Sequence, residues 1–548
     1  MRPSRTALAL AAYLAISLLY FGVRIAAHPG RDWIGFGADP QIFVWSFGWW
    51  PHAILHAQNP ILAHSVWPPV GLNLAWVSSI PGLAIAFAPV TLLFGPVAAY
   101  NVSSILMPAL AAWTAFLLCR HLIRSFWPAL AGGYLFGFSS YMLGQLEGHM
   151  HMSAVFLLPL AALVVLRYLE GSLSGRGLTW RFGLLLAGQV LLSTEVLFTL
   201  TLALAVALVC AFALLPSMRA RLRRIPGPLA GAYLIAGVVT SPLLGYAVAH
   251  FQRESINKPA AFPADLVNLL VPTRLTALST GWTHNTSALF AGNTAENGAY
   301  LGLPLIAVLF LFAWTNRRSE RARLLTFLIA LCVLCELGTA LHTRGDRHFA
   351  LPWRLVSGLP GFDNVLPVRL SVYLALAASV AAARWAASGT APRWARAGLV
   401  TAAVVAIAPA FWIDAWHTRP NRPAFFSTGV YKKYLKPNET VLLLPYPSLS
   451  GSMLWQAEAR FHFRVADASL SPVIPEGVPH LQTMLAVRSN DTPKGRGAAI
   501  LELARAQGAG AIVIDAGNPD PWRRLLDGTG LRGQELGGIY LYRVTLSG

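Results

Sequence analysis

Long apolar segments alternate with short polar turns over most of the chain. The first, Thr6 to Ile25, is long enough to cross a bilayer with a hydrocarbon core of about 30 Å. The intervening turns are alternately rich in arginine and rich in aromatic or acidic residues. This pattern predicts about eleven membrane-crossing helices. They are expected at 6–25, 97–118, 126–143, 153–169, as two helices within 182–215, and at 229–249, 300–314, 324–341, 371–387 and 397–416.

Two segments depart from a simple alternation of crossings. A full crossing at Ile80 to Phe94, which contains two prolines, would put the basic loop after Leu118 outside the cell. We therefore expect this segment to lie in or dip into the outer interface, covered by protein or water. Phe182 to Leu215 is too long for one helix and has arginines at both ends, so it predicts a hairpin of short helices turning at Ser193 to Glu195.

The arginine distribution also orients the chain. Two arginines precede the first apolar segment, so the N-terminus is expected in the cytoplasm and the following loop outside. An odd number of crossings places the C-terminus outside as well. A signal peptide is the competing interpretation, but the first segment is long and no small-residue cleavage site followed by a soluble chain is found.

The composition changes after His417. Buried strands are indicated at Val441 to Pro447, at Gly510 to Gly517 and in the final IYLYRVTL, and amphipathic helices at GRGAAILELARAQG and PWRRLLDGTG. We predict two domains, a multi-spanning membrane domain with catalytic outer loops at 1–417 and an external α/β domain at 418–548. No phosphate-binding glycine loop occurs in the sequence of the second domain.

Composition supports a polytopic membrane protein. Hydrophobic residues make up 55% of the 548 positions and charged residues 12%, about half the charged share of soluble domains. The net charge of +19 would suggest nucleic acid in a soluble chain, but here the basic residues cluster between apolar segments as topology signals, so we exclude nucleic acid as a partner. The four cysteines fall in or at the end of apolar segments and indicate neither disulfides nor a zinc site.

The first outer loop, Gly35 to Pro69, places one carboxylate, Asp39, ahead of an aromatic run. The run contains Phe43, Trp45, Phe47, Trp49 and Trp50. An acid among tryptophans at a membrane face suits chemistry on a substrate that resides in lipid. The alternative is that Asp39 only caps the next helix and the aromatic residues form an interfacial belt. Asp32 directly follows Arg31 and is interpreted as that arginine's charge partner.

Carboxylates, histidines and arginines gather on the predicted outer side. They include Asp39, Glu147, His149, His151, Glu195, Arg274, His284, Glu296, Arg354 and Arg369. Glu147 and His149 are candidates to orient an acceptor. A divalent ion held by these two residues with Asp39 stays open as an alternative, although Glu-x-His is a weak metal pattern and no metal is assigned. No cofactor is predicted with certainty.

These residue types suit transfer of a sugar from a lipid phosphate to a hydroxyl. The attacking oxygen needs a carboxylate to take its proton, and the leaving phosphate needs cations. Asp39 is the candidate base. Arg274, Arg354 and Arg369 are the candidate cations, because a guanidinium matches phosphate in a bidentate way.

Several motifs together resemble the polytopic GT-C-type glycosyltransferases of bacteria over Thr6 to Trp416. They are an acid soon after the first helix, a basic turn closing the next helix, an outer Glu/His loop, the Tyr-Leu-Gly of ENGAYLG (Glu296 to Gly302) and the late LPGFDNVLPVRL. Two features differ from many of these enzymes: Asp39 has no acidic neighbour, and no second arginine precedes the Pro-x-Arg that contains Arg369.

The resemblance implies a hexosyl- or pentosyltransferase of the bacterial inner (cytoplasmic) membrane. It would move a sugar from a polyprenyl-phosphate donor to a cell-envelope glycan, lipid or protein acceptor on the periplasmic side, with Asp39 as the base and Glu296 among the substrate-binding residues. The alternatives are a transporter or flippase for a lipid-linked saccharide and a membrane scaffold. Transporters often contain internal repeats, and no convincing repeat is found in this sequence.

Overall fold

The computed structural model describes residues 4–249, 259–445, 451–471, 474–478, 480–488 and 496–545. Its contacts divide the chain into two compact units. The first unit comprises Met1–Ala27, Val102–Ser241 and Arg253–His417, and the second comprises His28–Asn101, Pro242–Gln252 and Thr418–Gly548. The first outer loop thus folds with the C-terminal tail, although more than 300 residues of sequence separate them.

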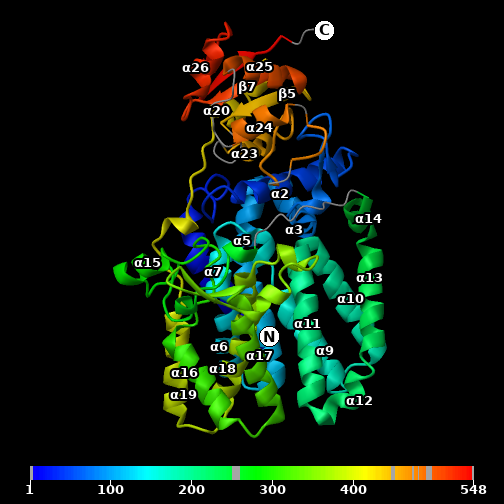
Figure 1. Cartoon of the computed structure of the whole chain (residues 1–548), viewed down its shortest axis with the longest axis vertical. Helices are drawn as coiled ribbons and strands as arrows, with labels where there is room; N and C mark the ends of the chain where they lie inside the picture. Colours follow the sequence, from blue (N-terminus) through cyan, green and yellow to red (C-terminus); the bar gives the residue numbers. More distant parts are fainter. Residues whose placement is uncertain are drawn as a thin grey trace. The chain divides into compact units, whose positions relative to one another are not determined.

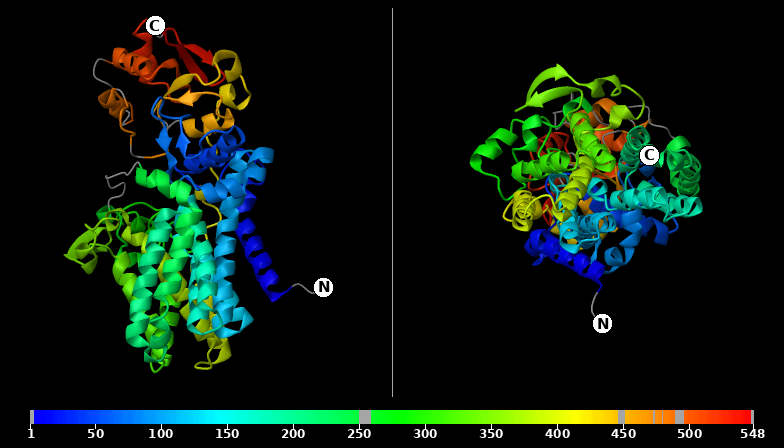
Figure 2. Two further views of the ribbon diagram at one scale, coloured as in Figure 1. Left: turned by 90° about the vertical axis from the view of Figure 1, so that its right-hand side faces the viewer. Right: turned by 90° about the horizontal axis from the view of Figure 1, so that it is seen from below.

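The first unit is a bundle of helices (Figure 1). Its helices are α1 (Arg5–Ser17, continued by η1 and η2 to Ile25), α5 (Pro96–Ile123), α6 (Phe126–Gly137), α7 (Ser140–Leu146), α8 (Met150–Ser153), α9 (Leu157–Leu169), α10 (Gly175–Leu192), α11 (Thr194–Leu214), α12 (Arg219–Leu222), α13 (Pro226–Val239), α15 (Gly281–Ser287), α16 (Gly302–Thr315), α17 (Glu320–Glu336), α18 (Ser371–Ala387) and α19 (Arg393–Ala406). Helix α10 packs along α13, and α6 packs along α18. Figure 2 shows the bundle from the side and end-on.

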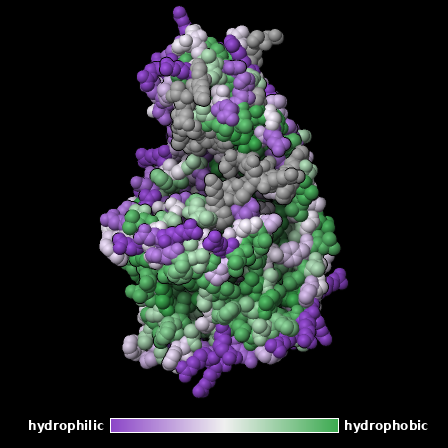
Figure 3. Space-filling view, viewed as in Figure 1, coloured by the Kyte–Doolittle hydropathy of each residue, from purple (hydrophilic) through white to green (hydrophobic). Residues whose placement is uncertain are grey.

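Several helices of the bundle are apolar enough to cross a membrane. Among the described residues, five elements have sufficient length and hydropathy, and a sixth is added if the bent pair α13 and α14 (Ser241–Ala249) is one span. The five are Arg5–Ile25, Pro96–Ile123, Met150–Leu169, Thr194–Leu214 and Pro367–Ala387. Hydrophobic residues cover much of the bundle surface (Figure 3). The protein is therefore a mostly helical membrane protein, and the count of about eleven crossings stays a prediction.

In the two irregular segments, 182–215 and 80–94, the helices end or begin at the polar residues and prolines. Helix α10 ends at Leu192, and Ser193 caps α11, its Oγ accepting the Val196 amide at 3.2 Å. This confirms the turn, but the prediction of short helices is wrong because α10 and α11 have 18 and 21 residues. In the second unit, the segment at 80–94 forms two short helices, α3 (Pro81–Ala86) and α4 (Ala88–Phe94), each with proline in its first turn.

Arginine-rich turns lie together at one end of the bundle. The turn containing α12 and those joining α16 to α17 and α18 to α19 are at the lower end in Figure 1, where Figure 3 shows hydrophilic residues. The α12 turn alone carries Arg219, Arg221, Arg223 and Arg224. Arginine is thus concentrated at one end of the bundle.

Glu336, at the end of α17, is fully buried, and in the described structure neither of its carboxylate oxygens has a hydrogen-bond partner. A buried polar group without a partner costs about 1–3 kcal/mol. We expect Glu336→Met to raise the free energy of unfolding by about that amount, seen as a higher midpoint of thermal unfolding in detergent. Glu320→Met, in the first turn of the same helix, is the control and should lower the midpoint slightly. An unchanged or lower midpoint for Glu336→Met would contradict the prediction.

The second unit contains a five-stranded mixed sheet with strand order β6-β5-β7-β9-β8. Strands β5, β6 and β7 are parallel, and β9 pairs antiparallel with β7 and β8. The strands are β5 (Thr440–Leu444), β6 (Arg464–Val465), β7 (Ala509–Asp515), β8 (Gln534–Leu536) and β9 (Ile539–Arg543), and the helices of this region are α20 (Ala424–Ser427), α21 (Tyr431–Tyr434), α23 (Ser452–Glu458), α24 (Leu481–Arg488), α25 (Gly497–Ala506) and α26 (Trp522–Asp527).

The elements predicted in the tail are present. β5, β7 and β9 lie where strands were expected, and α25 and α26 lie where helices were expected. Positions 446 and 447, at the end of the first predicted strand, lie outside the described residues. The division of the chain at 417/418 into a catalytic and an appended domain stays a prediction.

The aromatic run of α2 (Pro40–Leu55) is core of the second unit. All five of its Phe and Trp side chains are buried. Trp45 stacks on Trp49 with ring centroids 5.4 Å apart and donates a 2.7 Å hydrogen bond to Gln456 of α23. The interfacial belt is therefore wrong for this run, and its burial leaves no open face for a lipid. The rings fix α2 against α23 instead.

Candidate functional site

A buried polar network in the first unit is centred on Arg369. Its Nη1 donates to Glu195 Oε2 at 2.7 Å, and its Nε donates to Glu296 Oε2 at 3.0 Å. The side chains of Arg369 and Glu296 are only 9% and 3% exposed. Breaking one member of such a buried group is strongly unfavourable, because the remaining charges lose their compensation. The network is therefore a rigid part of the unit.

His149 and Gln145 extend this network. His149 Nδ1 lies 3.0 Å from Gln145 Oε1 and 3.5 Å from Glu296 Oε1. Because both neighbours are acceptors, Nδ1 carries the proton. Gln145 Nε2 donates to the Ala295 carbonyl at 3.2 Å, which ties α7 to the loop that holds Glu296. One arginine thus faces two carboxylates in this group.

Local sequence explains how these groups meet. Glu195 lies in the first turn of α11, and Arg369 lies in η9 (Pro367–Leu370), which leads into α18. Glu296 lies in the loop between α15 and α16. A Cβ at Gly144 would lie 2.2 Å from the Ala295 carbonyl oxygen, so only glycine lets α7 approach that loop.

Glu147 and Arg274 form a second polar pair in the same unit. Arg274 Nη2 lies 3.4 Å from Glu147 Oε1, and the two side chains are 40% and 7% exposed, respectively. Burial raises the pKa of Glu147, while the charges of Arg274 and His149 oppose that rise. A carboxyl group with a raised pKa next to a partly exposed arginine is a typical feature of functional sites.

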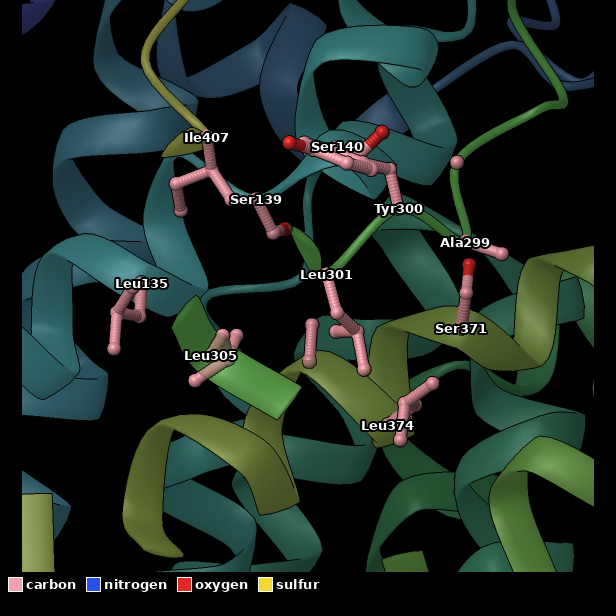
Figure 4. A pocket seen from close by; sticks show the side chains of 12 residues that line it. Leu135, Ser139, Ser140, Ala299, Tyr300, Leu301, Leu305, Ser371, Leu374 and Ile407 are labelled. Atoms are coloured by element: carbon pink, nitrogen blue, oxygen red, sulfur yellow. The ribbon is translucent and has the colours of Figure 1, made fainter. Parts of the chain in front are cut away.

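Two cavities of very different size lie in the first unit. The smaller one, of about 10 Å³, has serine hydroxyls and Tyr300 on one side and leucines on the other (Figure 4). It has room for about one water molecule and not for a substrate. The larger one is an open cleft of about 640 Å³ whose wall includes Arg274. Only the cleft is within the size range of ligand sites, about 300–1,000 Å³.

The structure brings together five of the seven predicted site residues. His149, Glu296 and Arg369 share the central network, and Glu147 pairs with Arg274. Arg354 lies exposed in η7 (Pro352–Leu355), and among the described contacts none joins its guanidinium to the network. The roles assigned to these residues stay predictions.

Asp39 belongs to the second unit, where it is half-buried and directly precedes α2. Its backbone is already helical and its side chain makes no capping hydrogen bond, so the capping alternative is wrong. Asp32 has Arg419 at 3.7 Å and His28 at 3.9 Å as charged neighbours. The structure thus gives Asp32 partners that lie beyond its sequence neighbour Arg31.

Two network residues, Glu195 and Gln145, were not among the predicted site residues. Glu195 was noted as an outer residue in a turn, and its position after the Ser193 cap gave no sign of an arginine partner. Gln145 is a buried amide near the end of the mainly apolar SYMLGQL helix. A glutamine in such a helix is the signal that a buried partner is required.

The described residues do not offer a ligand set for a metal ion. No group of three or more His, Cys, Asp or Glu side chains in the described part of the chain has a suitable arrangement. His149 and Glu296 already bind Gln145 and Arg369.

The network makes stability depend on pH. Burial alone would raise the pKa of Glu296, but Arg369 and His149 hold that pKa at about 2. The pKa of an unfolded glutamate is about 4.3. The network therefore stabilises the folded protein above that pH, and this stabilisation is lost as the pH falls toward about 2. We expect the midpoint of thermal unfolding of the native protein to fall as the pH is lowered through this window. The midpoint of Glu296→Gln should fall less steeply over the same window. Parallel curves for the two proteins in a pH series of differential scanning fluorimetry would contradict this.

Comparison with solved structures gives the class of fold. The chain matches the apo oligosaccharyltransferase of Archaeoglobus fulgidus with a TM-score of 0.56 and 12% identity, over 93% of this chain and 69% of that chain. It matches the arabinofuranosyltransferase AftD from Mycobacteria with a TM-score of 0.58 and 14% identity, over 99% of this chain and 40% of that chain. Both are GT-C glycosyltransferases, so the chain has a GT-C-like fold.

A further match is to archaeal oligosaccharyltransferase AglB from Archaeoglobus fulgidus in complex with an inhibitory peptide and a dolichol-phosphate. Its TM-score is 0.51 at 12% identity, over 98% of this chain and 74% of that chain. At the level of sequence, residues 9–356 match the family described as a domain of unknown function, DUF6311. The chain therefore belongs to the DUF6311 family. No curated protein matches it by sequence.

Proposed function

We propose that this protein is a membrane glycosyltransferase. It moves a hexosyl or pentosyl group from a polyprenyl-phosphate donor to a cell-envelope acceptor, a glycan, lipid or protein, at the periplasmic face of the bacterial inner membrane. The observation that carries the proposal is the pairing of buried Glu147 with cleft-lining Arg274 beside the Arg369 network. The GT-C-like fold, which covers nearly the whole chain, supports it.

A lipid phosphate suits the chemistry of the exposed cations. Arg274 is partly exposed and lines the cleft, so we assign it the contact with the phosphate of the donor. Arg354, which is exposed, is the second candidate for this contact. That one neighbour, AglB, binds a dolichol-phosphate is consistent with a donor of this kind.

Arg369 receives a different role in this proposal. Its guanidinium is held by two carboxylates, and binding a phosphate would require one of them to give way. We assign Arg369 to position Glu296 and, through Glu296, His149. Asp39 remains the proposed base that takes the proton from the acceptor hydroxyl as that oxygen attacks the sugar carbon and the phosphate leaves with the bonding electrons.

The test uses the full chain purified into lipid nanodiscs. Synthetic polyprenyl-phosphate sugars carrying a radiolabelled hexose or pentose are supplied with envelope lipid and glycan extracts, and label in the acceptor and in free sugar is measured. Turnover of at least one donor, with none of nucleotide-sugar donors, is expected. If no donor is turned over, while vesicles containing the protein move a lipid-linked saccharide across the bilayer, the transporter alternative holds and the proposal fails.

The membrane orientation is tested separately. Reporter fusions after Arg224, in the basic turn of α12, and after Gly548 should report opposite sides of the membrane, the first cytoplasmic and the second periplasmic. The physical reason is the concentration of arginine at the end of the bundle that contains α12. If both fusions report the same side, the orientation and the odd number of crossings are wrong.

A further inference from the structure

The open cleft of the first unit has two loop walls. One wall is the segment 274–284, which leads into α15, and the other is the segment 409–413, which follows α19. The side chains relevant to binding are Arg274, Ser279, Thr280, His284, Phe411 and Trp412. They combine cationic, hydroxyl and aromatic groups, and no carboxylate is among the described residues that line the cleft.

The two walls are fixed to each other before any ligand binds. The Ala277 amide donates to the Ala408 carbonyl at 2.7 Å, and the Ala410 amide donates to the Leu275 carbonyl at 2.8 Å. Buried Trp416 donates from its indole nitrogen to the Ala410 carbonyl at 2.7 Å, which anchors the second wall from beneath. A preformed cleft loses little conformational freedom on binding, so it suits specific recognition.

Trp412 is the most informative group in the cleft. Its side chain is 82% exposed although it lies on a wall whose backbone is pinned, and Phe411 supports it edge-on with ring centroids 4.5 Å apart. An aromatic face held in place at the edge of a cleft offers a platform for an apolar surface. The hydroxyls of Ser279 and Thr280 and the guanidinium of Arg274 offer hydrogen bonds on the same cleft.

This combination matches the chemistry of a saccharide. A sugar ring has one face of C–H groups, which packs on an aromatic ring, and a rim of hydroxyls, which need donors and acceptors. A lipid chain has no donors or acceptors, so it would make no use of the remaining hydrogen-bonding capacity of the hydroxyl and charged groups of the cleft, which also bond within the protein to Thr283 and Glu147. A volume of about 640 Å³ is large enough for more than a single small group.

We propose that this cleft binds a short saccharide, with one ring on Trp412 and its hydroxyls on Ser279 and Thr280. Under the proposed function this saccharide is the glycan acceptor, and only that identification rests on sugar transfer. Arg274 lines the same cleft and keeps its assignment to the donor phosphate, so the acceptor and the donor phosphate would share this cleft. The acceptor class is thereby narrowed from glycan, lipid or protein to glycan.

The experiment measures binding without a donor. The full chain in nanodiscs is titrated with a panel of unbranched neutral disaccharides and trisaccharides, followed by saturation-transfer difference NMR and, for the sugars that bind, by isothermal titration calorimetry. Trp412→Ala should weaken binding about ten-fold or more, and Trp412→Phe should restore most of it because the ring face is kept. Trp282→Ala is the matched control, since Trp282 in the same unit is 68% exposed and, in the described structure, does not line the cleft.

Every outcome bears on the inference. Loss of binding in Trp412→Ala with unchanged binding in Trp282→Ala supports it. Equal binding by all variants, or no binding of any panel sugar to the native chain, overturns it. If both alanine variants alter only lipid association, Trp412 is an interfacial anchor and the inference is overturned. Saccharide binding without any sugar transfer would sustain the cleft assignment while the proposed function fails.

Discussion

Asp39→Asn is expected to lower sugar transfer roughly 10²- to 10⁴-fold, the usual loss on removing a general base. Asparagine keeps the size of the side chain but cannot accept the proton of the attacking hydroxyl. The folding of α2 should not suffer, because the Asp39 side chain makes no capping bond to it. Transfer is measured with the labelled polyprenyl-phosphate donor, and the yield of folded protein is checked by size-exclusion chromatography.

Asp32→Asn is the matched control for this variant. It removes the only other acid that precedes Glu147 in the sequence, which lies 3.7 Å from Arg419. Ion pairs with exposed partners such as Arg419 and His28 contribute about 0–1 kcal/mol each, so transfer should change little. Folded Asp39→Asn protein with near-normal transfer would refute the assignment of the base and remove a main support of the enzyme interpretation.

Arg369→Met is expected to destabilise the folded protein by about 3–5 kcal/mol, because it leaves the buried charge of Glu296 and the partly buried charge of Glu195 without their shared cation. Arg369→Lys should lower the free energy of unfolding by less, because lysine keeps the positive charge. It should still be less stable than the native protein, because an ammonium group lacks the planar fork that bridges two carboxylates. The measurement is chemical denaturation in detergent followed by tryptophan fluorescence. Arg354→Met, at an exposed arginine on a neighbouring segment, should change stability by less than about 0.5 kcal/mol.

A second substitution separates charge compensation from simple packing. If Arg369 acts by neutralising Glu296, then Glu296→Gln should lower the free energy of unfolding much less in the Arg369→Met background than in the native chain. Costs that simply add would show that the two side chains do not interact. Stability of Arg369→Met equal to that of the native protein would contradict the network as a whole.

Local patterns were sufficient to predict many elements of the fold. The Ser193 turn and the strands β5, β7 and β9 were predicted correctly because caps and apolar runs act within a few residues. The core role of Trp45 and Trp49 was missed. Hydropathy marks such residues as apolar but cannot distinguish a lipid environment from the side of another helix.

The candidate site was predicted in part for the same reason. His149, Glu296 and Arg369 were selected individually as polar groups on the outer side, and the structure joins them. Their pairing could not be predicted, because Arg369 lies 73 residues from Glu296 and 174 residues from Glu195. No local pattern reports a contact at such a separation. Gln145 was overlooked although its polar side chain within an apolar helix required a partner.

The spacing of the Arg369 contacts has a consequence for biogenesis. At a synthesis rate of 5–20 residues per second, Glu195 leaves the ribosome roughly 9–35 s before Arg369. During that interval α11 has been synthesised, but the carboxylate of Glu195 in its first turn does not yet have Arg369 as a partner. Final assembly of the bundle therefore takes place only when α18 arrives, and a nascent chain that stops short of α18 exposes two uncompensated acids to quality control.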